Sequence, residues 1–179
     1  MMDGVAVKIR QGEPDDVPWV IALSVRVQEA LTSSGSKQVI GPLQVGMVES
    51  AISARCCYIL SLESTSDRLG SVIIMPLPHD HLYHQQLGAD TMKDFSKPHW
   101  VLQSLMLEPE WQGKRIGIRF LAGVAGLMGP ELGTIFLDCW EGNTKLQSFY
   151  SRAGFKHLGT VPENDYYVAV FAKEMCRED

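Results

Sequence analysis

A short loop rich in glycine and basic residues, placed between an apolar strand and a helix, is the feature that most constrains this fold. Residues 105–107 are apolar, 108–110 form an acidic turn around a proline, and 112–117 contain two glycines and two basic residues. Backbone N–H groups at a helix start are unpaired, and the helix dipole adds partial positive charge there. Glycine lets a ligand approach the backbone closely. The segment therefore predicts a cradle for a pyrophosphate group.

The patterns on either side of this loop predict a mixed order of strands and helices. Apolar runs, several of them alternating, predict strands at 5–10, 56–62, 69–75, 99–107, 134–140, 155–161 and 166–173. Apolar residues at helical spacing predict helices at about 14–31, 42–54, 112–127 and 144–153. A length of 179 residues, 45% of them hydrophobic, suits one α/β (α+β) domain over 1–179.

Residues 76–98 interrupt this order and predict an inserted loop, with a short helix near 82–87. The segment has no clear period and holds three of the five histidines. His79 and His81 would share one face of a strand, but the flanking prolines argue against a strand. No Glu or Cys stands at a familiar ligand spacing, so a polar loop is favoured over a metal site.

Composition narrows the classes of function. The formal net charge of -5 argues against a general nucleic-acid binder. No apolar run is long enough to span a bilayer, and the first eleven residues do not have the pattern of a signal peptide. The four cysteines fit no zinc pattern and indicate reduced thiols. We expect a cytoplasmic protein without nucleic-acid or membrane partners.

The first motif resembles the acyl-CoA-binding motif of the GNAT superfamily of N-acetyltransferases, Gln/Arg-x-x-Gly-x-Gly/Ala after a strand ending in Val-x-Pro. Gln112 and Gly117 match its first and last positions, and residues 107–109 match the strand end. Arg115 departs from the pattern, because the family usually has Gly there. Arg115 can itself meet a phosphate.

A second motif follows in the order and at the spacing that the superfamily shows. Residues 137–143 are a strand and a turn ending in Asn143, and the helix after them contains Tyr150 and closes with Gly154 and Phe155. The start of the chain, at 9–16, is similar to the family's opening strand and helix. Two motifs in the right order are far more specific than one, and the resemblance covers most of the chain except 76–98.

The resemblance implies the GNAT fold, a mixed, mostly antiparallel sheet of about six to seven strands flanked by about four helices. It also implies that the strand ending at Leu107 splays away from the strand ending at Trp140, with the pantetheine arm of acetyl-CoA in the gap. A backbone N–H of Leu105 or Met106 could stabilise the thioester oxygen. The implied acetyl-CoA contacts are Leu105, Met106, Leu107, Gln112, Gly113, Lys114, Arg115, Ile116, Gly117 and Asn143.

Tyr150 is the candidate general acid, because a phenol can donate a proton to the thiolate that leaves. The competing interpretation is that Tyr150 only packs its helix onto the sheet. The base that takes a proton from the incoming ammonium is less certain. Glu141 is the first choice, with Glu108 and His99 as alternatives, and each of the three is also explained as a solvated or structural residue.

The expected reaction moves the acetyl group of acetyl-CoA, as co-substrate, to a primary amine in a ternary complex, with no metal. An acyl-Cys139 route is disfavoured, because direct transfer needs no such residue. Three acids in the insertion, at Asp80, Asp90 and Asp94, suit a small cationic acceptor, and the insertion is expected to cap the acceptor site.

Three further possibilities remain open. A non-catalytic acyl-CoA-binding sensor or assembly module is the alternative function, and a nucleotide-binding α/β domain ranks last because neither common glycine pattern is present. A homodimer is also compatible with the sequence.

Overall fold

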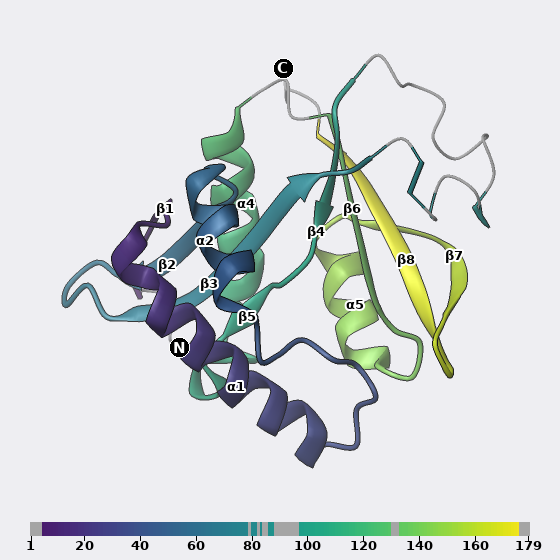
Figure 1. Cartoon of the computed structure of the whole chain (residues 1–179), viewed down its shortest axis with the longest axis horizontal. Coiled ribbons are helices and arrows are strands. Elements are labelled where there is room, and N and C mark those ends of the chain that lie inside the picture. The colour runs from purple at the N-terminus through teal and green to yellow at the C-terminus, as the bar shows by residue number, and fades with distance from the viewer. Residues whose placement is uncertain are drawn as a thin grey trace.

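One eight-stranded sheet organises the chain in the computed structural model (Figure 1), which describes residues 5–78, 80, 81, 83, 86, 87, 97–129 and 133–175. The strands run in the order β1-β2-β3-β4-β6-β8-β7, and β5 also pairs with β3. Their bounds are β1 Val7–Gln11, β2 Cys57–Leu62, β3 Arg68–Pro76, β4 His99–Leu102, β5 Met106–Leu107, β6 Gly133–Trp140, β7 Lys156–Glu163 and β8 Tyr166–Met175.

Helices cover both faces of this sheet. The helices α1 (Val17–Ser33) and α2 (Val45–Ser53) lie on one face, and α4 (Ile116–Met128) and α5 (Thr144–Arg152) lie on the other (Figure 1). All strand pairs are antiparallel except β4 with β6. The mixed, mostly antiparallel α+β class expected from the sequence is therefore confirmed.

Two of the differences from the expected element boundaries bear on the site. The run predicted as a single strand at 99–107 is divided into β4 and β5 at 103–105, which brings the number of strands to eight in the part of the chain that the structure describes. The helix expected from residue 112 begins at Ile116, because Gly113 and Arg115 have positive φ angles of 75° and 60°, which no α-helix permits.

The insertion expected at 76–98 and its short helix near 82–87 lie largely outside the described residues. The extent of that insertion and the single domain over 1–179 stay predictions.

The alternation of β6 sorts its side chains between the two faces of the sheet. Ile135, Leu137 and Cys139 pack in the core cluster under α4 and α5. Phe136 belongs to a different cluster on the opposite face, together with residues of β8. Because successive strand residues point to opposite faces, Asp138 lies on the face opposite to α4 and α5.

The parallel contact between β4 and β6 is short, and the two strands then separate. Their pairing ends at Val101 with Phe136. Beyond that point β5 pairs with β3 at Gly70 and Ser71, while β6 continues along β8 as far as Trp140. The sheet therefore opens between β5 and β6, as the resemblance to the GNAT superfamily implied.

A buried carboxylate fixes the entry to the first helix. Asp16, which is 1% exposed, accepts hydrogen bonds from Arg10 at 2.6 and 2.9 Å and from Arg68 at 2.7 Å. Its carboxylate also caps the backbone N–H of Glu13 at 2.8 Å. Burial favours the neutral acid, but these hydrogen bonds and the two cations outweigh it and lower the pKa of Asp16. The network joins β1, the start of α1 and the start of β3.

Candidate active site

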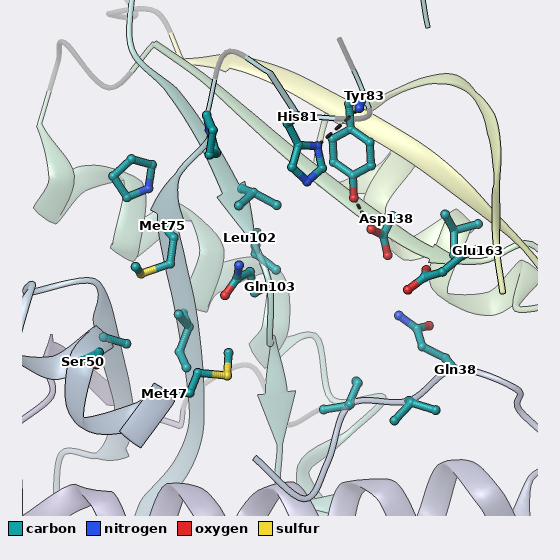
Figure 2. A pocket seen from close by; sticks show the side chains of 18 of the residues that line it. Gln38, Met47, Ser50, Met75, His81, Tyr83, Leu102, Gln103, Asp138 and Glu163 are labelled. Atoms are coloured by element: carbon teal, nitrogen blue, oxygen red, sulfur yellow. Dashed lines mark hydrogen bonds between the residues drawn. The ribbon is translucent and has the colours of Figure 1, made fainter. Parts of the chain in front are cut away.

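A cavity of about 570 Å³ lies beside α2 on the face of the sheet opposite to α4 and α5 (Figure 2). Side chains from α2, β3, β4, β6 and β8 form its floor and walls, and residues 38–40 of the connection between α1 and α2 cover it. Pro76, Pro78, His81 and Tyr83 bring the start of the predicted insertion to its rim. The volume is typical of pockets that bind small molecules.

Acidic and phenolic groups gather at one end of this cavity. The buried Tyr83 hydroxyl donates a hydrogen bond to the Asp138 carboxylate, and Glu163 lies close to Asp138 (Figure 2). Burial raises the pKa of Asp138, although the hydrogen bond from Tyr83 and the nearby His81 act in the opposite direction. Burial and the charge of Asp138 raise the pKa of Glu163. A carboxyl group with a raised pKa is a common property of a catalytic base.

The opposite end of the cavity is mostly apolar, with Ser50 of α2 as a polar group there (Figure 2). Met47 of α2 and Met75 of β3 lie on the far side of Gln103 from Asp138 and Glu163 (Figure 2). The order of the sheet explains this separation, because β3 precedes β4 and β6 while Glu163 belongs to β7 at the far edge. The cavity therefore has one polar and one mostly apolar end.

The connection between α1 and α2 is held over the cavity by side-chain hydrogen bonds. Gln28 of α1 accepts from the backbone N–H groups of Ile40 and Gly41 at 2.7 and 3.1 Å. Gln38 accepts from the N–H of Trp140 at 3.1 Å and so joins this connection to the end of β6. The cover of the cavity is thereby attached to the strand that carries Asp138.

The loop at 112–117 lies at the other side of the opening, before α4. Arg115 occupies the N-cap position of α4 with a left-handed backbone, and its side chain does not cap the helix. Gln112 donates from Nε2 to the Leu107 carbonyl at 3.1 Å and fixes the turn to the end of β5. Where the GNAT motif usually has glycine, Arg115 keeps the backbone conformation that glycine adopts most readily. The backbone at Arg115 is therefore compatible with the conformation of a glycine at this position.

The basic residues expected at this loop have different surroundings. Lys114 and Arg115 are exposed, and Lys114 Nζ lies 4.6 Å from the centre of the Trp111 ring. Arg119 donates to the Val5 carbonyl at 2.9 Å, which ties α4 to the start of the chain. Leu105 and Leu107 are half-buried and Met106 is buried. The ten residues expected to contact acetyl-CoA therefore lie at β5, in the loop at 112–117 with the start of α4, and at the start of α5. Their binding role stays a prediction.

Tyr150 lies on the α4–α5 face, across the sheet from the cavity. It is buried at 4% exposure and packs against the rings of Phe149, Phe155 and Phe171 at centroid distances of 5.2 to 6.0 Å. Burial raises the pKa of its phenol, so the hydroxyl is protonated at neutral pH. Both interpretations from the sequence fit this position, because the ring packs α5 while the hydroxyl keeps its proton.

The residues weighed as base have contrasting positions. Glu141 is exposed on the turn after β6 and is not among the residues that line the cavity. Glu108 accepts two hydrogen bonds from Arg26 at 3.0 and 2.5 Å, which makes it a structural ion pair. His99 is buried against Phe136. Asn143 caps α5 by accepting from the Leu146 N–H at 3.0 Å.

Sequence reasoning missed Asp138, Glu163 and Gln38 as site residues. A signal for Asp138 was present, since it is the one charged residue in the β6 run of residues 133–140. Glu163 and Gln38 stand in polar segments where no pattern separates them from their neighbours.

Two observations bear on metals and membranes. Among the residues the structure describes, no three His, Cys, Asp or Glu side chains gather as a possible metal site. Within the same residues, no helix is both long and apolar enough to cross a membrane.

The model of the acetyltransferase (GNAT) family matches residues 40–155, which is more than half of the chain. The chain therefore belongs to the GNAT acetyltransferase family. The matched range contains both motifs found in the sequence, the opening of the sheet, and most of the cavity.

Individual relatives agree with this assignment. The chain is 26% identical over 172 residues to YesJ of Bacillus subtilis (strain 168), described as an uncharacterized N-acetyltransferase, covering 92% of this chain and 88% of YesJ. A GNAT-family acetyltransferase structure from Listeria monocytogenes 4b F2365 shares its fold with a TM-score of 0.66, at 22% identity and 94% coverage of both chains. The ribosomal-protein-S18-alanine N-acetyltransferase of Escherichia coli gives a TM-score of 0.63, at 14% identity and with 97% and 96% of the two chains covered.

Proposed function

We propose that this protein transfers the acetyl group of acetyl-CoA to a primary amine of a small-molecule acceptor, by direct attack within a ternary complex. The observation that carries the proposal is the opening between β5 and β6, with the loop at 112–117 at one side and the cavity holding Asp138 at the other. A thioester placed in this opening would be within reach of groups from both faces of the sheet.

The acetyl-CoA half of the site rests on the cradle and the edge of β5. The first turn of α4 begins at Ile116 without a side-chain cap, so its N–H groups suit a pyrophosphate. A Cβ on Gly113 would meet no atom within 4 Å, which leaves room for a ligand against the backbone. Lys114 and Arg115 add positive charge, and the edge of β5 opposite its pairing with β3 suits the amide groups of pantetheine.

The acceptor half rests on Asp138. The free amine attacks the thioester carbon, the carbon–sulfur bond breaks, and the thiolate that leaves takes a proton, for which Tyr150 is our candidate donor. The attacking nitrogen then loses its second proton as the amide forms, and that proton returns to the Tyr150 phenolate through solvent. Before or during attack the ammonium loses a proton, and Asp138 accepts it directly or through a water molecule. A base with a raised pKa binds this proton more readily than an ordinary carboxylate.

The first test is calorimetric titration with acetyl-CoA and CoA, with ATP as the control ligand. We expect micromolar binding of both CoA species and none of ATP, followed by amine-dependent thiol release. Absence of CoA binding would overturn the proposal. Tight binding without turnover of any amine would instead favour a non-catalytic acyl-CoA-binding module.

The second test decides between Asp138 and Glu141 as base. General-base catalysis is typically worth about 10²–10⁴-fold in rate. We expect Asp138→Asn to lower turnover by about 10² or more and Glu141→Gln to have a much smaller effect, since Glu141 lies outside the cavity. The reverse order would assign the base to Glu141.

A further inference from the structure

We infer that the acceptor is a monoamine with an apolar body and no carboxylate, such as an alkylamine or arylalkylamine. Its ammonium would lie at Asp138 and Glu163 and its body against Met47 and Met75. This inference rests on the proposed function and adds the class of acceptor.

Charge supports one bound ammonium at the polar end. Asp138 and Glu163 line the same cavity, and no Lys or Arg occurs among the described residues that line it. Around the two carboxylates lie His81, Tyr83 and Tyr166, of which His81 is the one group that can carry a positive charge. The charge of Asp138 raises the pKa of Glu163, and a cation placed between two neighbouring carboxylates stabilises both in their ionised form. An ammonium supplies that cation and is also the group to be acetylated.

The apolar end argues against a second charge on the acceptor. Met47 and Met75 contribute apolar side chains there, and Ser50 contributes one hydroxyl (Figure 2). Burying an unpaired ammonium or carboxylate against such side chains costs several kcal/mol. A diamine of similar length would place its second ammonium among them.

The same lining argues against amino acids as acceptors. The carboxylate of an α-amino acid lies next to its amine, so it would face Asp138 and Glu163. The carboxylate of the amino acid would be repelled by these two carboxylates. The described lining offers no Lys or Arg that could neutralise its charge. Methionine side chains adapt to bodies of different shape, which fits both straight alkyl chains and aromatic rings.

Two matched pairs of amines test the inference on the wild-type protein. Hexylamine and 1,6-diaminohexane differ by a second ammonium, and phenethylamine and phenylalanine differ by a carboxylate. We expect kcat/KM to favour hexylamine by about 10-fold or more, and phenethylamine by about 100-fold or more. Equal values within a pair, or the reverse preference, would overturn the inference.

A variant whose preference between two amines changes is a sharper test than a variant that only loses activity. Met47 is 37% exposed, so Met47→Asp should fold while it places a carboxylate at the apolar end. We expect this variant to narrow or invert the preference for hexylamine over 1,6-diaminohexane, and Met47→Leu to keep the wild-type preference. An unchanged ratio in Met47→Asp would contradict the assigned position of the acceptor body.

Failure of the inference and failure of the proposed function give different results. Acetyl-CoA binding and turnover with the wrong order of amines would overturn only the acceptor class. Titration of the same four amines into the protein tests the acceptor class even where transfer fails, and the expected order of affinities there would support it. Loss of acetyl-CoA binding would overturn the proposed function itself.

Discussion

Asp138 is a single residue with opposing effects on activity and stability. Its carboxylate faces the cavity from a strand whose other described side chains are mostly buried, and burial raises its pKa. The folded protein therefore holds the neutral form more tightly than the unfolded chain does. That property suits a proton acceptor, and it weakens the folded state wherever the group is ionised.

Asp138→Asn is expected to stabilise the protein at pH 7 while it lowers turnover. A carboxyl group with a raised pKa contributes stability that is present below its unfolded pKa of about 4 and is lost as the pH rises through the folded pKa. Thermal unfolding at pH 7 should therefore give a higher Tm for the variant, and the gain should shrink toward pH 4. A lower Tm at pH 7 would mean that the ionised carboxylate is well compensated.

Tyr83→Phe is expected to move the acidic limb of the pH–rate profile to higher pH. The hydrogen bond from the Tyr83 hydroxyl lowers the pKa of Asp138, so its removal raises that pKa further. The profile of kcat/KM from pH 5 to 9 measures the shift. Tyr166→Phe is the matched control, since Tyr166 lowers the pKa of Glu163 and is not among the groups that shift the pKa of Asp138, and it should leave this limb in place. Equal shifts of the acidic limb in both variants would show that the hydrogen bond from Tyr83 does not set the pKa of Asp138.

At the scale of elements, α4 depends on close approach to α5. A Cβ on Gly117 would lie 3.0 Å from Cζ of Phe149 and 3.5 Å from Cδ1 of Leu107. Gly117 is the last residue of the 112–117 loop and lies in the first turn of α4. Because it has no side chain, the start of α4 can pack closely against Phe149 and Leu107. The last glycine of the motif is thus a packing residue as well as a loop residue.

Gly117→Ala is expected to destabilise the protein by about 1–3 kcal/mol and to weaken acetyl-CoA binding, because overpacking displaces the start of α4. Gly126→Ala on the same helix is the control, since a Cβ there meets nothing within 4 Å. That control should gain up to about 1 kcal/mol from helix propensity. Urea denaturation and calorimetry measure the two effects. Gly117→Ala with unchanged acetyl-CoA affinity would show that the position of α4 does not limit binding.

Considered as a whole molecule, the protein places its two candidate proton-transfer groups on opposite faces of one sheet. Tyr150 belongs to the core cluster under α4 and α5, and Asp138 faces the cavity beside α2. The opening between β5 and β6 lies between the two faces. Under the proposed function, the sheet separates the group that gives a proton from the group that takes one.

Tyr150→Phe tests this arrangement. The ring is kept, so the packing with Phe149 and Phe171 should survive. We expect turnover to fall by about 10²-fold with acetyl-CoA affinity mostly intact, measured by thiol release and calorimetry. Unchanged turnover would leave Tyr150 with a packing role alone, and an equal loss of affinity would indicate a general disturbance of the opening.

The fold could be predicted from the sequence because its signals are local. Apolar periodicity located most elements within a few residues, although the helix expected from residue 112 begins at Ile116. The role of the loop at 112–117 in binding stays a prediction. The acceptor side could not be predicted in this way. Tyr83, Asp138 and Glu163 come from three distant segments, and only the strand order β4-β6-β8-β7 brings them together. Glu141 was favoured for its place just after a strand, but it lies on an exposed turn, and its role stays a prediction.

The opening in the sheet also separates mutations around the loop at 112–117 from mutations in the cavity. The loop and helix starts that surround one side share none of the residues that line the cavity on the other. Under the proposed function, changes at Met47, Gln38 or Glu163 are therefore expected to alter the choice of acceptor while acetyl-CoA binding is kept. A few substitutions under α2 and the α1–α2 connection would then give a new acceptor with the same acyl donor.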